Sequence, residues 1–94
     1  MLVTLVFSVI GNSIGFAIPP QVAKELEVAP GDALLVTTKE IIKEGKVTPI
    51  QIYLRGKIIK SGGKYGGFII DKAIVNHLQL QKGNMLNAEI VKEG

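Results

Sequence analysis

Four basic residues and one aromatic residue occur close together in the second half of the chain: Arg55, Lys57, Lys60, Lys64 and Tyr65. Arg55 and Lys57 are two residues apart, so on a β-strand they point to one face. Lys60 and Lys64 flank glycines, and Tyr65 follows directly. A basic β-hairpin of this kind can lie along a DNA groove, with lysines on phosphates and the arginine beside guanine. The pattern predicts contact with a polyanion, although lysines on an exposed strand also protect against aggregation.

The charge is unevenly distributed along the chain. Residues 1–47 carry four lysines against five carboxylates, whereas residues 48–94 carry seven basic residues against three acidic ones. Residues 1–22 contain no charged side chain. Contact with a polyanion is therefore expected mainly in the second half, with Asn12 and Ser13 of the first glycine turn as minor contacts. The uncharged first segment is better suited to a protein partner or to self-association.

Catalytic chemistry is not indicated by the residue types present. The chain has no cysteine, which excludes disulfides and thiolate metal sites. Its single histidine, His77, has no clustered carboxylate or cysteine partner, and no serine has an identifiable base. The segment from Ser61 to Gly67 lacks the Gly-Lys-Ser/Thr ending of a phosphate-binding loop. We predict no enzyme activity, no cofactor, no metal and no small-molecule substrate.

These residues are expected to be held by a mainly β fold with two short helices. Hydrophobic residues make up 47% of the chain but aromatic residues only 5%, so the core is aliphatic, which favours β-structure. The nearly unbroken apolar run of residues 2–10 is expected to be covered on both faces. Asp71 is expected to cap the second helix. The patterns predict strands over 2–10, 14–18, 33–38, 48–60, 68–70 and 85–91, and helices over 20–27 and 73–79.

The element order β-β-α-β occurs twice, and the sequence repeats with it. A shift of 52 residues brings turn glycines and apolar positions into coincidence, and these are the positions that a repeated fold must keep. We predict one domain over residues 1–94, with repeats at about 1–38 and 48–94 and a connector at about 39–47. The coinciding pairs include Gly11 with Gly63, Gly15 with Gly67, Phe16 with Phe68, Ile18 with Ile70, Leu26 with Leu78, Gly31 with Gly83 and Leu34 with Leu86, and conservative matches include Val6 with Ile58 and Phe7 with Ile59.

The first repeat resembles the AbrB/MazE (SpoVT-AbrB) family of swapped-hairpin DNA-binding domains. The resemblance lies in Gly11-Asn12-Ser13-Ile14-Gly15-Phe16-Ala17-Ile18-Pro19-Pro20, followed by Leu26 and Pro30-Gly31-Asp32. The second repeat departs from the pattern, with Asp71-Lys72 for the two prolines and Lys82-Gly83-Asn84 for Pro-Gly-Asp. In that family two chains exchange hairpins to close one barrel. Two repeats in one chain therefore imply a single-chain pseudo-dimeric swapped-hairpin barrel, with a double-psi β-barrel as the alternative.

The resemblance also implies a function, that of a prokaryotic transcription regulator that binds double-stranded DNA. Family members typically carry basic residues on the first hairpin arm, whereas here only the second arm carries them. We therefore expect DNA binding mainly through the second hairpin, with self-association of pseudo-dimers compatible with it. The alternatives are a protein-binding double-psi module and an antitoxin-like component of a toxin–antitoxin pair. The chain ends soon after the last predicted strand, which favours a stand-alone regulator over an antitoxin.

The apolar segment at the start of the chain does not predict a membrane partner. Residues 1–10 lack the basic flank of a signal peptide and are too few to cross a bilayer. We expect a cytoplasmic protein.

Overall fold

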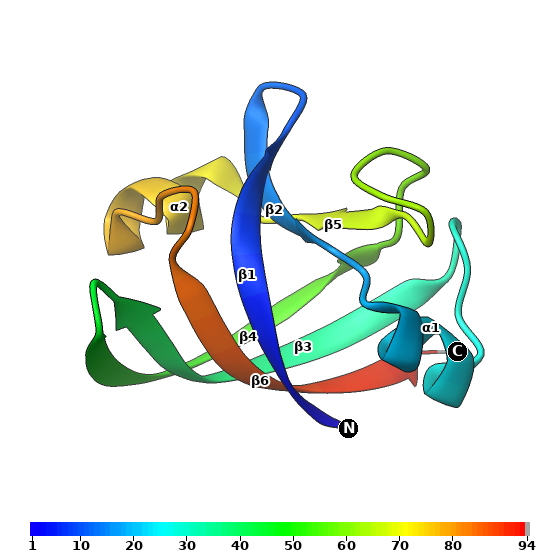
Figure 1. Ribbon diagram of the computed structural model, residues 1–94, viewed down its shortest axis with the longest axis horizontal. Coiled ribbons are helices and arrows are strands. Elements are labelled where there is room, and N and C mark those ends of the chain that lie inside the picture. Colours follow the sequence, from blue (N-terminus) through cyan, green and yellow to red (C-terminus); the bar gives the residue numbers. More distant parts are fainter. Residues whose placement is uncertain (94) are drawn as a thin grey trace.

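Within residues 1–93, the part of the chain that the computed structural model describes, there are six strands and two short helices (Figure 1). The prediction of a mainly β fold with two short helices is confirmed. In chain order the elements are β1 (Leu2–Ile10), β2 (Ser13–Ala17), α1 (Pro20–Leu26), β3 (Ala33–Lys43), β4 (Lys46–Lys57), β5 (Gly67–Ile69), α2 (Lys72–Leu78) and β6 (Met85–Glu93).

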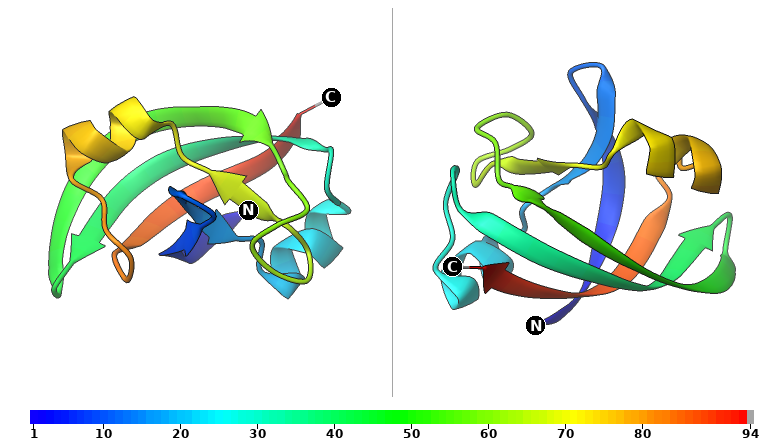
Figure 2. Two further views of the ribbon diagram at one scale, coloured as in Figure 1. Left: turned by 90° about the horizontal axis from the view of Figure 1, so that it is seen from above. Right: turned by 180° about the vertical axis from the view of Figure 1, so that it is seen from behind.

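The strands form one antiparallel sheet in the order β4-β3-β6-β1-β2-β5. The sheet is strongly curved, as the view from above in Figure 2 shows. Its two terminal strands, β4 and β5, share no ladder, and a single bridge between Ile59 and Gly67 joins their edges. The sheet is therefore not closed into a barrel, and the predicted barrel is wrong in this respect. The cause is local: β5 has only three residues, and the glycine-rich loop of residues 60–66 leaves little length over which β4 and β5 can pair.

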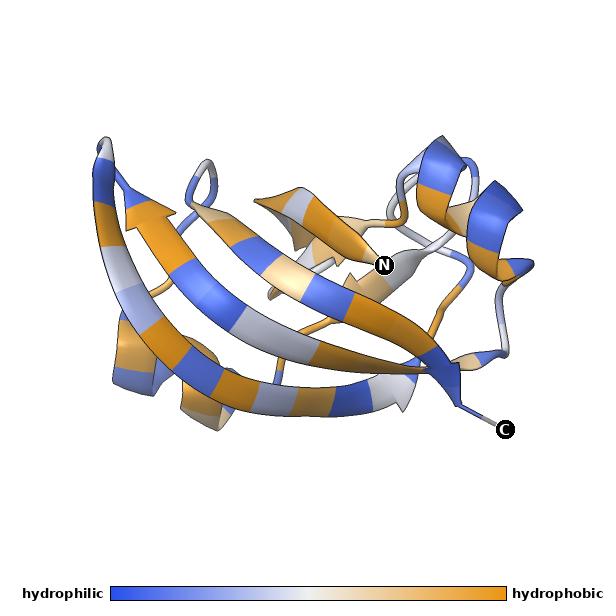
Figure 3. Ribbon diagram, turned by 90° about the horizontal axis from the view of Figure 1, so that it is seen from below, coloured by the Kyte–Doolittle hydropathy of each residue, from blue (hydrophilic) through white to orange (hydrophobic). Residues whose placement is uncertain are grey.

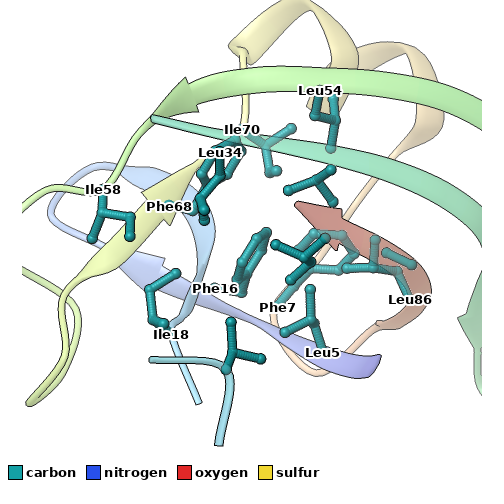
Figure 4. Close-up of a cluster of buried hydrophobic side chains, with 14 of the residues drawn as sticks. Leu5, Phe7, Phe16, Ile18, Leu34, Leu54, Ile58, Phe68, Ile70 and Leu86 are labelled. Atoms are coloured by element: carbon teal, nitrogen blue, oxygen red, sulfur yellow. The ribbon is translucent and has the colours of Figure 1, made fainter. Parts of the chain in front are cut away.

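The two β-β-α-β units pair in equivalent ways across the sheet. β1 pairs with β6, and β4 pairs with β3, so the first strand of each unit lies against the last strand of the other. Between β2 and β5, Phe16 pairs with Phe68, and the two rings stack with centroids 5.2 Å apart (Figure 4). The helices begin and end 52 residues apart, as do the starts of β3 and β6.

The first strands of the two units correspond with an offset of 51 residues. The N–H of Gly83 donates to the carbonyl of Phe7, and in the equivalent place the N–H of Gly31 donates to the carbonyl of Ile58. Phe7 and Ile58 are both buried. The sequence matches that paired Ile58 with Val6 are therefore wrong by one residue, because the loop before β5 is one residue longer than the turn before β2. A one-residue slip moves every side chain of a strand to the other face.

A two-residue turn joins the two units. Glu44 and Gly45 both have positive φ, at 49° and 78°, as in the type I′ turns that fit tight β-hairpins. Residues 39–43, assigned to a connector from the sequence, continue β3, and residues 46 and 47 begin β4.

Burial agrees with the aliphatic core but not with the expected environment of β1. Leu2, Val6 and Val9 are 73%, 54% and 55% exposed, so the expectation that this strand is covered on both faces is wrong. In the part of the chain that the structure describes, no second layer lies over the outer face of the sheet, where hydrophobic and hydrophilic bands alternate along the strands (Figure 3). The capping prediction is confirmed, since the N–H of Ala73 donates to Oδ1 of Asp71 over 2.8 Å.

Candidate nucleic-acid interface

The predicted contact residues belong to two hairpin arms on the same side of the sheet. We call residues 7–16, the paired part of β1 and β2 with their turn, the first arm. Residues 55–67, which comprise the end of β4, the following loop and the start of β5, form the second arm. Both turns project upward in Figure 1, and the view from behind in Figure 2 agrees.

On the strand part of the second arm, Arg55 and Lys57 lie on one face, as predicted. Both are exposed, and the intervening alternation places Leu54 and Ile58 in the core. Nε of Arg55 lies 2.8 Å from Oε1 of Glu93, across β3 from β4 to β6. That oxygen accepts no directed hydrogen bond within the described residues, so the contact is a charge pairing at the surface. Arg55 is thus partly neutralised, whereas Lys57 has no carboxylate within ion-pair distance among residues 1–93.

The loop part of the second arm carries Lys60 and Lys64, both exposed. Nζ of Lys64 lies 5.5 Å from the centroid of the Tyr65 ring, within the range of a cation–π contact. Tyr65 itself is half-buried and packs against the core. It therefore supports the loop, and its ring is less available for contact with a ligand than the sequence suggested.

The loop is held against the body of the molecule by close backbone approaches. A Cβ at Gly66, where φ is +91°, would lie 2.5 Å from the carbonyl oxygen of Ile59. A Cβ at Gly62, where φ is +100°, would lie 2.8 Å from Cδ1 of Ile10 on the first arm. Gly66 lets the loop of the second arm pack on itself, and Gly62 lets it approach Ile10 of the first arm.

Four of the predicted residues line two separate clefts. Asn12 and Ser13 line a cleft of about 430 Å³ together with Lys72 at the start of α2. Lys64 and Tyr65 line a different cleft, of about 520 Å³, against Pro19 and Pro20 at the start of α1 and residues 4–8 of β1. The minor contacts proposed for the first arm are therefore on the same side as the second arm but not in one site with it.

Two residues near the candidate surface were missed in the sequence analysis. Tyr53 is 64% exposed and lies on the same face of β4 as Arg55 and Lys57. Its position could have been predicted, because side chains two residues apart on a strand share a face. Lys72 lies beside the first arm only because α2 packs there, and no sequence signal indicates this contact.

Two other lysines donate hydrogen bonds to the carbonyls at the ends of the helices. Nζ of Lys43 donates to the carbonyls of Leu78 and Gln79, over 2.8 Å to the latter, at the end of α2. Nζ of Lys92 donates over 3.2 Å to the carbonyl of Glu27, at the end of α1. A cation at a helix C-terminus complements the partial negative charge of the unpaired carbonyls. These two lysines stabilise helix ends, and we do not count them among the candidate contacts.

Comparisons with protein-family models, with curated proteins and with solved structures gave no match. The function must therefore be argued from the residues themselves. Neither helix within residues 1–93 is long and apolar enough to cross a membrane. In the same part of the chain, no three acidic or histidine side chains are grouped so as to hold a metal ion.

The charge of the second arm is its most distinctive feature. From residue 45 to residue 70 the sequence contains five basic residues and no carboxylate. The first arm has no charged residue, and Val9 is exposed near its tip. The two arms thus differ sharply in charge.

Proposed function

We propose that this protein binds double-stranded DNA through its second arm and acts as a transcription regulator of the AbrB type. The observation that carries the proposal is the charge of this projecting arm, which has four cations, Arg55, Lys57, Lys60 and Lys64, within a stretch of the sequence, residues 45–70, that contains no carboxylate. Lys57, Lys60 and Lys64 would contact phosphates, because cations without ion-pair partners are free to replace the counterions of DNA. Arg55 would also contact DNA once its ion pair with Glu93 is broken.

We also propose that the two β-β-α-β units form a single-chain pseudo-dimer of the swapped-hairpin type, with an incompletely closed wall. The pairing of β1 with β6 and of β4 with β3 supports an exchange of hairpins between the units. Phe16 and Phe68 are equivalent positions of the two units and pair with each other, which supports an internal twofold axis at that point. A double-psi arrangement is less well supported, since β1 and β2 are direct hairpin partners joined by the turn at Gly11 and Asn12.

The test is the salt dependence of duplex binding, measured by fluorescence anisotropy on mixed-sequence DNA. We expect affinity to fall steeply with salt, and the combined change Lys57→Ala, Lys60→Ala and Lys64→Ala to reduce the log–log slope by about 2.7, at about 0.9 per phosphate contact. The matched control is Lys24→Ala, Lys39→Ala and Lys82→Ala, which removes the same charge from exposed positions outside the arms. The proposal fails if wild-type protein does not bind duplex at low salt, or if both triple variants lower the slope equally.

A second candidate function is protein binding through the first arm and the adjoining part of β1. The exposed side chains of Leu2, Val6 and Val9, in a segment without charge, favour this alternative. Val6→Lys separates the two candidates, since it should abolish a protein contact there and leave the salt slope on DNA unchanged.

A further inference from the structure

The two terminal strands of the sheet face each other across an open slot. Within residues 1–93, β4 forms a ladder with β3 only and β5 with β2 only. Beyond the Ile59–Gly67 bridge, the free edges of β4 and β5 diverge toward α2 (Figure 1). A cleft of about 230 Å³ lies between them, lined by residues 53–55 of β4, residues 68–71 at and after β5, and Ile74 of α2. The slot is therefore bounded by two strand edges and one helix.

Unpaired backbone groups of β4 point into this slot. The N–H of Ile58 donates to the carbonyl of Asp32 on the β3 side. In an antiparallel ladder the backbone groups alternate between the two sides of a strand. The N–H and C=O groups of Tyr53, Arg55 and Lys57 therefore face the open edge, where an additional strand can pair with them.

The helix that borders the slot has an apolar side that is incompletely covered. In α1, Val22 and Ala23 are buried, and Val22 is fully enclosed. The equivalent of Val22 in α2 is Ile74, which is only half-buried, and α2 has no fully buried residue. The difference between two equivalent helices indicates unfilled apolar space on the slot side of α2.

The β4 side of the slot carries two cations. Arg55 and Lys57 extend from the outer face of β4, in the segment of residues 45–70 that has no carboxylate. Asp71 is the one carboxylate among the residues that line this cleft, and its Oδ1 accepts the N–H of Ala73. Glu93, which pairs with Arg55, lies on β6, away from the slot.

We propose that this slot binds an extended acidic segment of a partner protein as an added strand between β4 and β5. Side chains of an added strand alternate between two faces. Those beside Leu54 would point inward, toward Phe68 and Ile74, and are apolar. Those beside Arg55 and Lys57 point outward and are acidic, because opposite charges in adjacent strands attract. The segment competes with DNA, since both need Arg55 and Lys57.

The experiment is a titration of the whole protein, labelled with ¹⁵N, with a short end-blocked peptide of alternating glutamate and valine. We expect shifts in the amide signals of Tyr53, Arg55, Lys57 and Ile69, with binding below about 1 mM. The same peptide N-methylated at every glutamate and valine keeps its charge but has no N–H to donate to either strand edge, and it should bind at least about tenfold more weakly. A lysine–valine peptide should not bind.

The matched protein variants are Ile74→Glu and Ala73→Glu, which add the same charge to the slot side and to the exposed side of α2. Ile74→Glu should weaken peptide binding about tenfold or more, and Ala73→Glu should have a much smaller effect. Equal binding of the N-methylated peptide, shifts confined to lysine side chains, or no binding at about 1 mM would overturn the proposal. Because no DNA is present, these outcomes are independent of the proposed function.

Discussion

At the residue scale, the glycines show how a correct pattern can have an unexpected physical cause. Gly15 was selected from the sequence as a turn residue, but it lies within β2 and its φ is not positive. It is required because a Cβ there would lie 2.2 Å from the carbonyl oxygen of Phe68, in the neighbouring strand. Gly83, in contrast, has a φ of +92° and open space around it, so only its backbone conformation favours glycine.

Gly15→Ala is therefore expected to be far more destabilising than Gly83→Ala. The first change forces two backbones apart and should cost about 3 kcal/mol or more, whereas the second should cost about 1 kcal/mol. Chemical denaturation followed by circular dichroism measures both. Similar costs for the two substitutions would mean that β2 and β5 separate easily, contrary to the close approach described.

At the element scale, helices were easier to predict than strands. Pro20 and Asp71 mark the helix starts in the sequence, and both helices lie within one residue of their predicted bounds. β3 and β4 extend through most of the predicted connector, because an apolar and charged run such as residues 39–47 fits either a linker or a strand, and β4 ends at Lys57 instead of at residue 60. The two-residue turn at Glu44 and Gly45 sets the register of β4 against β3, and with it the face that each β4 side chain occupies.

The stacked pair at the centre of the sheet provides a prediction at this scale. Phe16→Leu and Phe68→Leu should lower the free energy of unfolding by similar amounts, since the two rings occupy equivalent positions and are both buried. A double-mutant cycle should give a coupling of about 1 kcal/mol, as expected for stacked rings. Strongly unequal single effects, or no coupling, would argue against equivalent environments.

At the scale of the whole molecule, the two units share one core and should not unfold separately. β1 completes the sheet beside β6, and β4 beside β3, so neither unit keeps its partners when the other unfolds. We expect a single unfolding transition in urea, coincident by circular dichroism and by tyrosine fluorescence. Two separated transitions would show that the units are independent.

The candidate site was predictable only in part at this scale. The shared face of Arg55 and Lys57 was predicted correctly, because the alternation of side chains between two faces is a property of any β-strand. The contact of Arg55 with Glu93 joins residues 38 positions apart through β3, and no local pattern contains it. The docking of the second arm on Ile10 is equally non-local.

The turn at Glu44 and Gly45 has a consequence for how such a molecule can change. In an assembly of two identical chains, every substitution appears twice, so a recognition surface must keep its symmetry. When a two-residue turn joins two such units in one chain, each unit can accept substitutions independently of the other. Here the first arm is neutral and the second arm is basic. Under the proposed DNA-binding function, the target need not be an inverted repeat, and a site with different left and right halves suits the molecule better.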